Sequence, residues 1–171
     1  MRRSFHPGSY RIRIAPFLML VFAAIGIGDA FYDSYSIYTG QMLWCPPPID
    51  GCNTVANSSY ARIFGIPLGN LGVVFYLYMF ALAALLLVDP FSRGLRLGAL
   101  IYTALGVVGS IYFMYVQFAY IHAFCIYCLV SAVLTLLLVV VAIWHFRATK
   151  KKPSTSFISG CEDVNQCLGI S

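Results

Sequence analysis

Four of the six cysteines in this chain of 171 residues fall into two closely spaced pairs. Cys125 and Cys128 form a C-x-x-C motif at the start of a long apolar run, and Cys45 and Cys52 lie in a polar segment after the first apolar run. Two thiols one helical turn apart can close a reducible disulfide, and the free N–H groups at a helix N-terminus favour a thiolate at the first sulfur. The two pairs therefore indicate a path for electrons by thiol–disulfide exchange.

The same four cysteines could instead act as structural staples or bind zinc. A C-x-x-C disulfide restrains little of the chain, so it is a poor staple, and such pairs are more often redox centres or half of a metal site. A centre with four thiolates would resemble structural zinc, but it would sit at a lipid interface without the usual two C-x-x-C motifs. The spacing favours redox chemistry and no metal. Cys161 and Cys167, in the tail after Lys152, do not fit this path. We interpret them as incidental, with metal binding or regulation as the alternative.

Composition indicates that most of the chain lies in a lipid bilayer, because 60% of its residues are hydrophobic and only 10% are charged. Four runs are long enough to cross ~30 Å of hydrocarbon as helices. The predicted fold class is therefore an all-α integral membrane protein, a four-helix bundle. The predicted spans are residues 14–38, 66–88, 95–120 and 124–146. The predicted divisions are a cytoplasmic lead (1–13), a membrane domain (14–147) and a disordered cytoplasmic tail (148–171).

The distribution of basic residues predicts the orientation in the membrane. Ten of the eleven Lys and Arg residues lie before the first span, after the second or after the fourth, and Arg62 alone lies between the first two. The positive-inside rule places both termini and the turn at 89–94 in the cytoplasm, so both cysteine pairs face outward from a cytoplasmic (inner) membrane. This distribution also accounts for the net charge of +5, and no nucleic acid partner is expected. Alternatively, the first apolar run could be a cleavable signal peptide with Arg2 and Arg3 as its basic end. Its removal would leave three spans and place one basic cluster on the outer side of the membrane.

Residues 41–67 form the one sizeable segment expected outside the cytoplasm. Three prolines and an Asp-Gly turn separate its two cysteines. Residues 53–64 are predicted to form a short helix, capped by Asn53 or Thr54, that lies on the membrane surface and covers what is beneath it. The loop cysteines can meet a soluble protein, whereas the C-x-x-C pair at the membrane boundary can meet a lipid-soluble acceptor. We therefore expect electrons to pass from the partner protein to the loop pair, then to the C-x-x-C pair and finally to a quinone.

Several short motifs accompany the cysteines. Ser58 follows the second loop cysteine by six residues, Phe-Gly-Ile-Pro-Leu occupies 64–68, Phe-Tyr occupies 75–76, and Phe-Cys-Ile-Tyr-Cys occupies 124–128. In this order the motifs resemble the vitamin K epoxide reductase family, and more narrowly its bacterial members that make disulfides. The resemblance covers residues 14–146. Another family of quinone-reducing membrane proteins carries its C-x-x-C motif in the first outer loop, which is the reverse of the order here.

This resemblance implies a four-helix bundle around a quinone, either ubiquinone or menaquinone, capped by the loop helix. It implies that Cys45 exchanges with a thioredoxin-fold (DsbA-like) protein, and that Cys52 hands electrons to Cys125. Cys128 would then lie beside the quinone. Ser58 matches the serine or threonine that supports the loop and the site in the family.

Four polar residues in the predicted spans are further candidates. Asn70 could offer its amide to a quinone carbonyl, although it could equally face a neighbouring helix, and Tyr76 could donate its hydroxyl. Asp29 and Asp33 lie four residues apart on one face of the first span, and carboxylates inside a membrane are functional hypotheses by default. Because quinone reduction consumes two protons, these carboxylates could form a proton route.

Two departures from the family bear on the substrate. Ala132 stands four residues after Cys128, where the vertebrate enzymes carry a tyrosine near the head group, which disfavours a vitamin K epoxide as substrate. The chain carries no thioredoxin-like domain, so a separate partner is expected. The predicted function is a membrane thiol–disulfide oxidoreductase that oxidises this partner and reduces a quinone. A quinone epoxide reductase and a non-enzymatic membrane scaffold stapled by disulfides are the alternatives.

Overall fold

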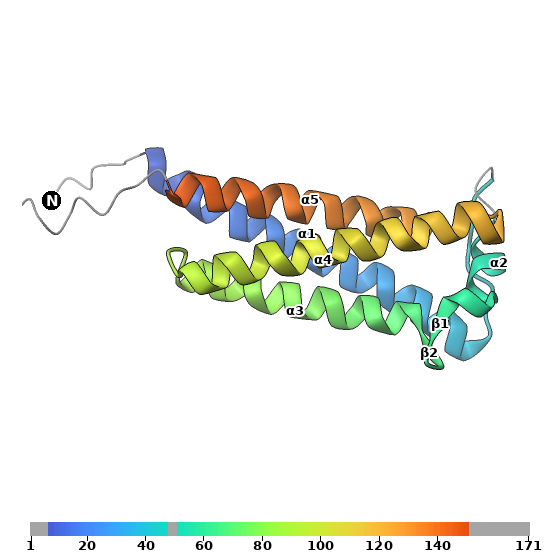
Figure 1. Ribbon diagram of the computed structural model, residues 1–171. Helices are drawn as coiled ribbons and strands as arrows, with labels where there is room; N and C mark the ends of the chain where they lie inside the picture. The colour runs from blue at the N-terminus through green and yellow to red at the C-terminus, as the bar shows by residue number, and fades with distance from the viewer. Residues whose placement is uncertain (1–6, 48–50, 151–171) are drawn as a thin grey trace, which may run out of the picture.

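Four long helices form an elongated bundle in the computed structural model, which describes residues 7–47 and 51–150 (Figure 1). They are α1 (Pro7–Thr39), α3 (Leu68–Val88), α4 (Arg93–Val116) and α5 (Ile126–Lys150). Each is long and apolar enough to cross a membrane. The spans are Arg13–Thr39, Leu68–Val88, Arg93–Ile121 and Ile126–Thr149. The predicted all-α membrane bundle is therefore confirmed. Much of the predicted lead and tail, with Cys161 and Cys167, lies outside the described residues.

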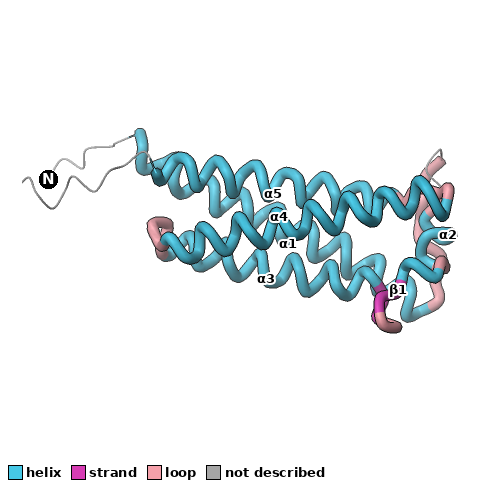
Figure 2. The backbone as a smooth tube through the Cα atoms, in the orientation of Figure 1, coloured by secondary structure: helices cyan, strands magenta, loops and turns pink. Residues whose placement is uncertain are grey.

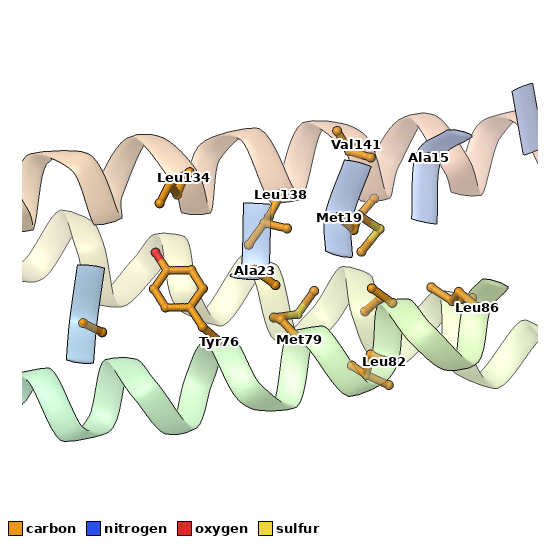
Figure 3. Packing of buried hydrophobic residues seen from close by; sticks show 14 residues of the cluster. Ala15, Met19, Ala23, Tyr76, Met79, Leu82, Leu86, Leu134, Leu138 and Val141 are labelled. Atoms are coloured by element: carbon orange, nitrogen blue, oxygen red, sulfur yellow. The ribbon is translucent and has the colours of Figure 1, made fainter. Parts of the chain in front are cut away.

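Small residues on α1 let the neighbouring helices approach closely in the core. Ala15 and Ala23 are fully buried and alternate with Met19, and together they pack against α3 and α5 (Figure 3). Gly26 continues this face, since a Cβ there would overlap the ring of Tyr76. Many large apolar side chains instead point outward along all four helices, as expected for a surface that contacts lipid. The bundle thus has a narrow, tightly packed interior and a lipid-facing exterior.

The elements that cover the bundle lie at the end opposite the start of α1 (Figure 2). Between α1 and α3 the chain forms a set of short elements, and a π-helical turn, η2 (Gln117–Ile121), extends α4 before the start of α5. The short elements are α2 (Cys52–Ala56), the 3-10 helix η1 (Ser59–Ala61), β1 (Arg62–Ile63) and β2 (Ile66–Pro67). The two strands pair antiparallel, with Arg62 opposite Pro67. This arrangement brings the loop and the α4–α5 connection to the same end of the bundle (Figure 1).

The predicted loop helix over 53–64 is wrong in extent, because α2 ends at Ala56. The side chain of Asn57 donates to the carbonyl of Asn53 at 2.9 Å, and the hydroxyl of Ser58 donates to the carbonyl of Val55 at 2.7 Å. These bonds occupy carbonyl groups at the end of the helix, and Ser58 then turns to an extended conformation. The predicted cap is also wrong, since Gly51 precedes α2 and no side chain caps its N-terminus.

Candidate functional site

The structure places the four predicted cysteines in one cluster at the covered end of the bundle. Cys45 and Cys52 form a disulfide with their Cα atoms 6.2 Å apart, and Cys125 and Cys128 hold free thiols. Cys52 and Cys125 are fully buried, whereas Cys45 and Cys128 are half-buried. All four cysteines pack in the same apolar cluster as Leu43. The disulfide and the two thiols are therefore neighbours in space although Cys52 and Cys125 are 73 positions apart in the sequence.

Two contacts hold the extended segment before Cys45 in place. The side chain of Asn53, in α2, accepts a hydrogen bond from the N–H of buried Leu43 at 2.9 Å and donates one to its carbonyl at 3.2 Å. The hydroxyl of Tyr127, in α5, donates to the carbonyl of Trp44 at 2.7 Å. Because α2 begins with Cys52, the pair of Asn53 bonds fixes the two halves of the loop disulfide relative to each other. The sequence interpretation treated Asn53 as a cap and missed this role.

Gly51 brings the loop against the segment that leads into α5. A Cβ at this position would lie 2.8 Å from the backbone N and O atoms of Phe124 and from the Cβ of Ala123. Backbone atoms cannot move aside as a flexible side chain can, so a glycine is required here for close approach. The contact places α2, and with it Cys52, next to the residue that precedes Cys125 in the chain.

Gln117 is a buried polar residue that contacts both cysteines of the C-x-x-C motif. Its side-chain oxygen accepts a hydrogen bond from the N–H of Cys125 at 3.0 Å, and its side chain also hydrogen-bonds the sulfur of Cys128. It belongs to the π-helical turn η2, and such turns occur frequently at functional sites. Sequence reasoning missed Gln117. Its signal was an uncharged polar side chain at the end of an apolar run.

The surroundings of Cys125 favour its thiolate. A hydrogen bond from the Cys128 thiol lowers the pKa of Cys125 below its ordinary value, with burial acting in the opposite direction. Backbone N–H groups of Cys128 and Tyr127 add to the lowering, because Cys125 lies at the N-terminus of α5. This agrees with the expectation from the sequence that the first sulfur of the motif carries the thiolate.

A cavity of about 280 Å³ lies inside the bundle next to Cys128. Its wall is mostly apolar and aromatic, with Asp29, Asp33 and Ser110 among the polar contributors. Tyr76 also lines it and is almost fully buried. Other residues that line the cavity include Phe75, Phe113, Met114, Tyr127 and Ser131.

Tyr76 joins α3 to α5 across this cavity. Its hydroxyl donates to the carbonyl of Ser131 at 2.9 Å and lies 2.8 Å from the Ser131 hydroxyl and 3.3 Å from that of Thr135. Figure 3 shows the ring in the core, with the hydroxyl directed toward α5. The predicted hydroxyl donor is thus beside the cavity, but its proton is engaged by the α5 backbone.

The structure places Asn70 and Ser58 away from this cavity. The amide oxygen of Asn70 accepts a hydrogen bond from Ser34, and its nitrogen donates to the hydroxyl of Tyr38 at 2.7 Å. Asn70 is absent from the described lining of the cavity, and its amide connects α1 to α3 instead. Ser58, which bonds the end of α2, lines a smaller cavity next to Cys125.

Four membrane-spanning helices with a loop disulfide packed on a C-x-x-C thiol pair define a membrane redox-protein architecture. A sequence model described as the vitamin K epoxide reductase family matches residues 17–143, and this protein belongs to that family. The chain is also similar to a protein of Arabidopsis thaliana named thiol-disulfide oxidoreductase LTO1, with 34% identity over 113 residues. The match covers 63% of this chain but 30% of the relative, so the chain spans about a third of the relative's length.

Proposed function

We propose that this protein is a membrane thiol–disulfide oxidoreductase that oxidises a thioredoxin-fold protein outside the cytoplasm and passes two electrons to a membrane quinone. The observation that carries the proposal is the packing of a loop disulfide against two free thiols, one of which, Cys128, lines an apolar cavity. Membership of the vitamin K epoxide reductase family and the name of the Arabidopsis relative support thiol–disulfide chemistry.

The different burial of the two loop cysteines determines which sulfur of the disulfide the partner attacks. Cys45 is half-buried and Cys52 is fully buried, so an incoming thiolate reaches the sulfur of Cys45. Attack there breaks the loop disulfide, forms a mixed disulfide with the partner and releases the thiolate of Cys52. The second thiol of the partner then displaces Cys45. The partner leaves oxidised, and both loop cysteines are reduced.

The second exchange moves the electrons to the C-x-x-C pair. The Cys52 thiolate attacks Cys125 when that residue is disulfide-bonded to Cys128, and Cys45 then attacks Cys52 to restore the loop disulfide. The products are a closed loop disulfide and two C-x-x-C thiols, which is the state that the structure shows. The favoured thiolate at Cys125 can then close a disulfide with Cys128 as the two electrons leave.

The cavity fits a quinone head group. Its volume of about 280 Å³ is close to the lower limit of small-molecule pockets, about 300 Å³, and its walls are apolar and aromatic. The hydroxyl of Ser110, which lines the cavity, would donate a hydrogen bond to a carbonyl oxygen of the head group. A bound quinone would supply a sink for two electrons and two protons. Cys128 would face it, and Phe75 and Phe113 would exclude water from around it.

We infer the outward orientation of the site from the positions of basic residues. Arg93 and Arg96 lie at the turn between α3 and α4, at the end of the bundle opposite the cysteines, and the positive-inside rule assigns that end to the cytoplasm. Treatment of intact cells with a reductant and a membrane-impermeant maleimide should label Cys45. Labelling that requires permeabilised cells would reverse the orientation.

Quinol formation tests the proposed reaction. Purified protein is mixed with a reduced thioredoxin-fold donor and ubiquinone or menaquinone, and one quinol per donor disulfide is expected. Cys128→Ser should abolish quinol formation, whereas the matched changes Cys161→Ser and Cys167→Ser should leave it unchanged. Epoxide turnover without donor-disulfide formation would favour an epoxide reductase. If the Cys128→Ser protein kept all of its activity although no quinone was reduced, a non-enzymatic scaffold held together by disulfides would be favoured.

A further inference from the structure

Two cavities at the covered end of the bundle share part of their walls. The larger one holds the proposed quinone site, and a second one of about 30 Å³ lies between the loop and the bundle. In the described part of the chain, four residues line both cavities, and Asp33 and Cys128 are the polar ones among them. Cys125 and Gln117 line only the smaller cavity, and Asp29 lines only the larger one.

The position of Asp33 at this shared wall depends on a small neighbour. A Cβ at Gly69, in α3, would lie 2.8 Å from the carboxylate oxygen Oδ2 of Asp33. The glycine therefore leaves room for the carboxyl group between α1 and α3. The carboxyl group is also near enough to act electrostatically on both C-x-x-C sulfurs, Cys125 and Cys128. Its position therefore depends on α3 as well as on its own helix, α1.

Closing the C-x-x-C disulfide releases protons on the two sides of this wall. Conversion of the two thiols to the Cys125–Cys128 disulfide releases two electrons and two protons in all, with the proton of Cys125 leaving first as its thiolate forms, and reduction of a quinone to a quinol consumes the same numbers. Cys128 lines the larger cavity, so its proton is released there. Cys125 lines only the smaller cavity, so its proton must cross the wall.

The smaller cavity can carry this proton from Cys125 to Asp33. Its volume of about 30 Å³ accommodates one water molecule, which needs roughly 10–15 Å³. The water would have polar partners in the side chains of Asp33, Gln117 and Ser58, all of which line the cavity. Asp29 lies one helical turn from Asp33 on the same face of α1, and it lines the larger cavity.

We propose that Asp33 is the proton carrier between the thiol pair and the quinone, with Asp29 as the next carrier in the larger cavity. Asp33 accepts the proton that leaves Cys125 when its thiolate forms, and it releases this proton into the larger cavity as the quinone is reduced. The electrons pass through Cys128, so the electrons and the proton of Cys125 reach the quinone by different side chains. This inference rests on the proposed quinone reduction.

Asp33→Asn tests the inference, because the amide has the same shape but cannot carry the proton. Loss of a positioned acid–base group costs about 10²–10⁴-fold in rate, so quinol formation should slow by at least about 100-fold. Asp33→Glu should restore part of the rate. The matched control is Asp89→Asn, since Asp89 is exposed after α3 at the other end of the bundle, and its quinol rate should stay within about twofold of the original.

Two measurements without quinone complete the test. Exchange between reduced donor and the loop disulfide should proceed at the original rate in Asp33→Asn, which also shows that the variant is folded. Infrared difference spectra of the unaltered protein, C-x-x-C disulfide minus dithiol, should show a carboxyl carbonyl band that disappears in Asp33→Asn.

The outcomes separate this inference from the proposed function. A protein that forms no quinol in its unaltered form overturns both. Normal quinol formation in the unaltered protein, with an equal rate in Asp33→Asn, overturns the proton carrier alone. A carboxyl band that persists in Asp33→Asn likewise overturns it and assigns the signal to another carboxyl group. A lost band together with a slowed rate and intact donor exchange supports it.

Discussion

Removing the Asn53 side chain should make the loop disulfide easier to reduce. In the structure this side chain makes two hydrogen bonds to the backbone of Leu43, which is 4% exposed. In the disulfide-bonded form these bonds hold the segment with Cys45 beside the helix that carries Cys52, and they are lost when the opened loop moves away. Asn53→Ala removes this stabilisation of the disulfide-bonded form, so the two thiols close less readily.

The size of the effect follows from the two bonds. A hydrogen bond contributes about 1 kcal/mol, so the pair contributes about 2 kcal/mol, which is about 30-fold in the equilibrium constant for disulfide closure. At 29.6 mV per tenfold, the reduction potential of the pair should rise by ~45 mV. Asn53→Asp keeps the acceptor for the Leu43 N–H but, when ionised, has no donor for the carbonyl. It should show about half of this change.

Equilibration against glutathione buffers measures the potential, with the fraction of oxidised loop pair read by alkylation and mass spectrometry. Thr54→Ala is the matched control, because Thr54 is the exposed neighbour of Asn53 in α2. Its potential should equal that of the unaltered protein. If Asn53→Ala and Thr54→Ala gave the same potential, the two bonds would have no part in holding the loop cysteines together.

Three further changes probe the packing around the thiols. Gly51→Ala should destabilise the fold by about 1–3 kcal/mol, because the new Cβ would lie 2.8 Å from the backbone of Phe124. It should also slow electron transfer from the loop pair to Cys125, and a normal transfer rate in stopped-flow exchange would refute this. Cys128→Ala removes the hydrogen bond that lowers the pKa of Cys125, so the midpoint of Cys125 alkylation should move to higher pH and alkylation at pH 7 should slow. An unchanged midpoint would assign the lowering to the helix terminus. Tyr76→Phe should cost about 1 kcal/mol of stability through the lost bond to Ser131, seen as a lower melting temperature, and an unchanged melting temperature would contradict it.

The membrane spans were predictable because hydropathy alone fixes which residues lie in hydrocarbon. The predicted first span, 14–38, agrees with the apolar part of α1, whereas the helix itself begins earlier, at Pro7. The loop helix was less predictable, since side chains such as Asn57 and Ser58 compete for backbone carbonyl groups and end α2 early. Periodicity of apolar residues does not report this competition.

The cysteine spacing indicated the chemistry, but the contacts that position the cysteines needed three-dimensional information. Asn53 looked like a helix cap, and its bonds to Leu43 depend on how the loop folds back. The direction of the Asn70 amide is set by Ser34 on another helix, which spacing within one helix cannot show. Gln117 could have been suspected as a polar residue near the end of an apolar run, although its contacts with the C-x-x-C cysteines come from the π-helical turn.

The transfer of electrons between the two pairs is tested most directly by trapping the disulfide that joins them. Cys128→Ser protein is reduced, reoxidised with the disulfide-bonded form of the thioredoxin-fold protein, alkylated and digested, and the cross-linked peptides are identified by mass spectrometry. The relay predicts a Cys52–Cys125 disulfide with Cys45 alkylated. A Cys45–Cys125 cross-link, or an intact Cys45–Cys52 bond with Cys125 alkylated in every molecule, would contradict it.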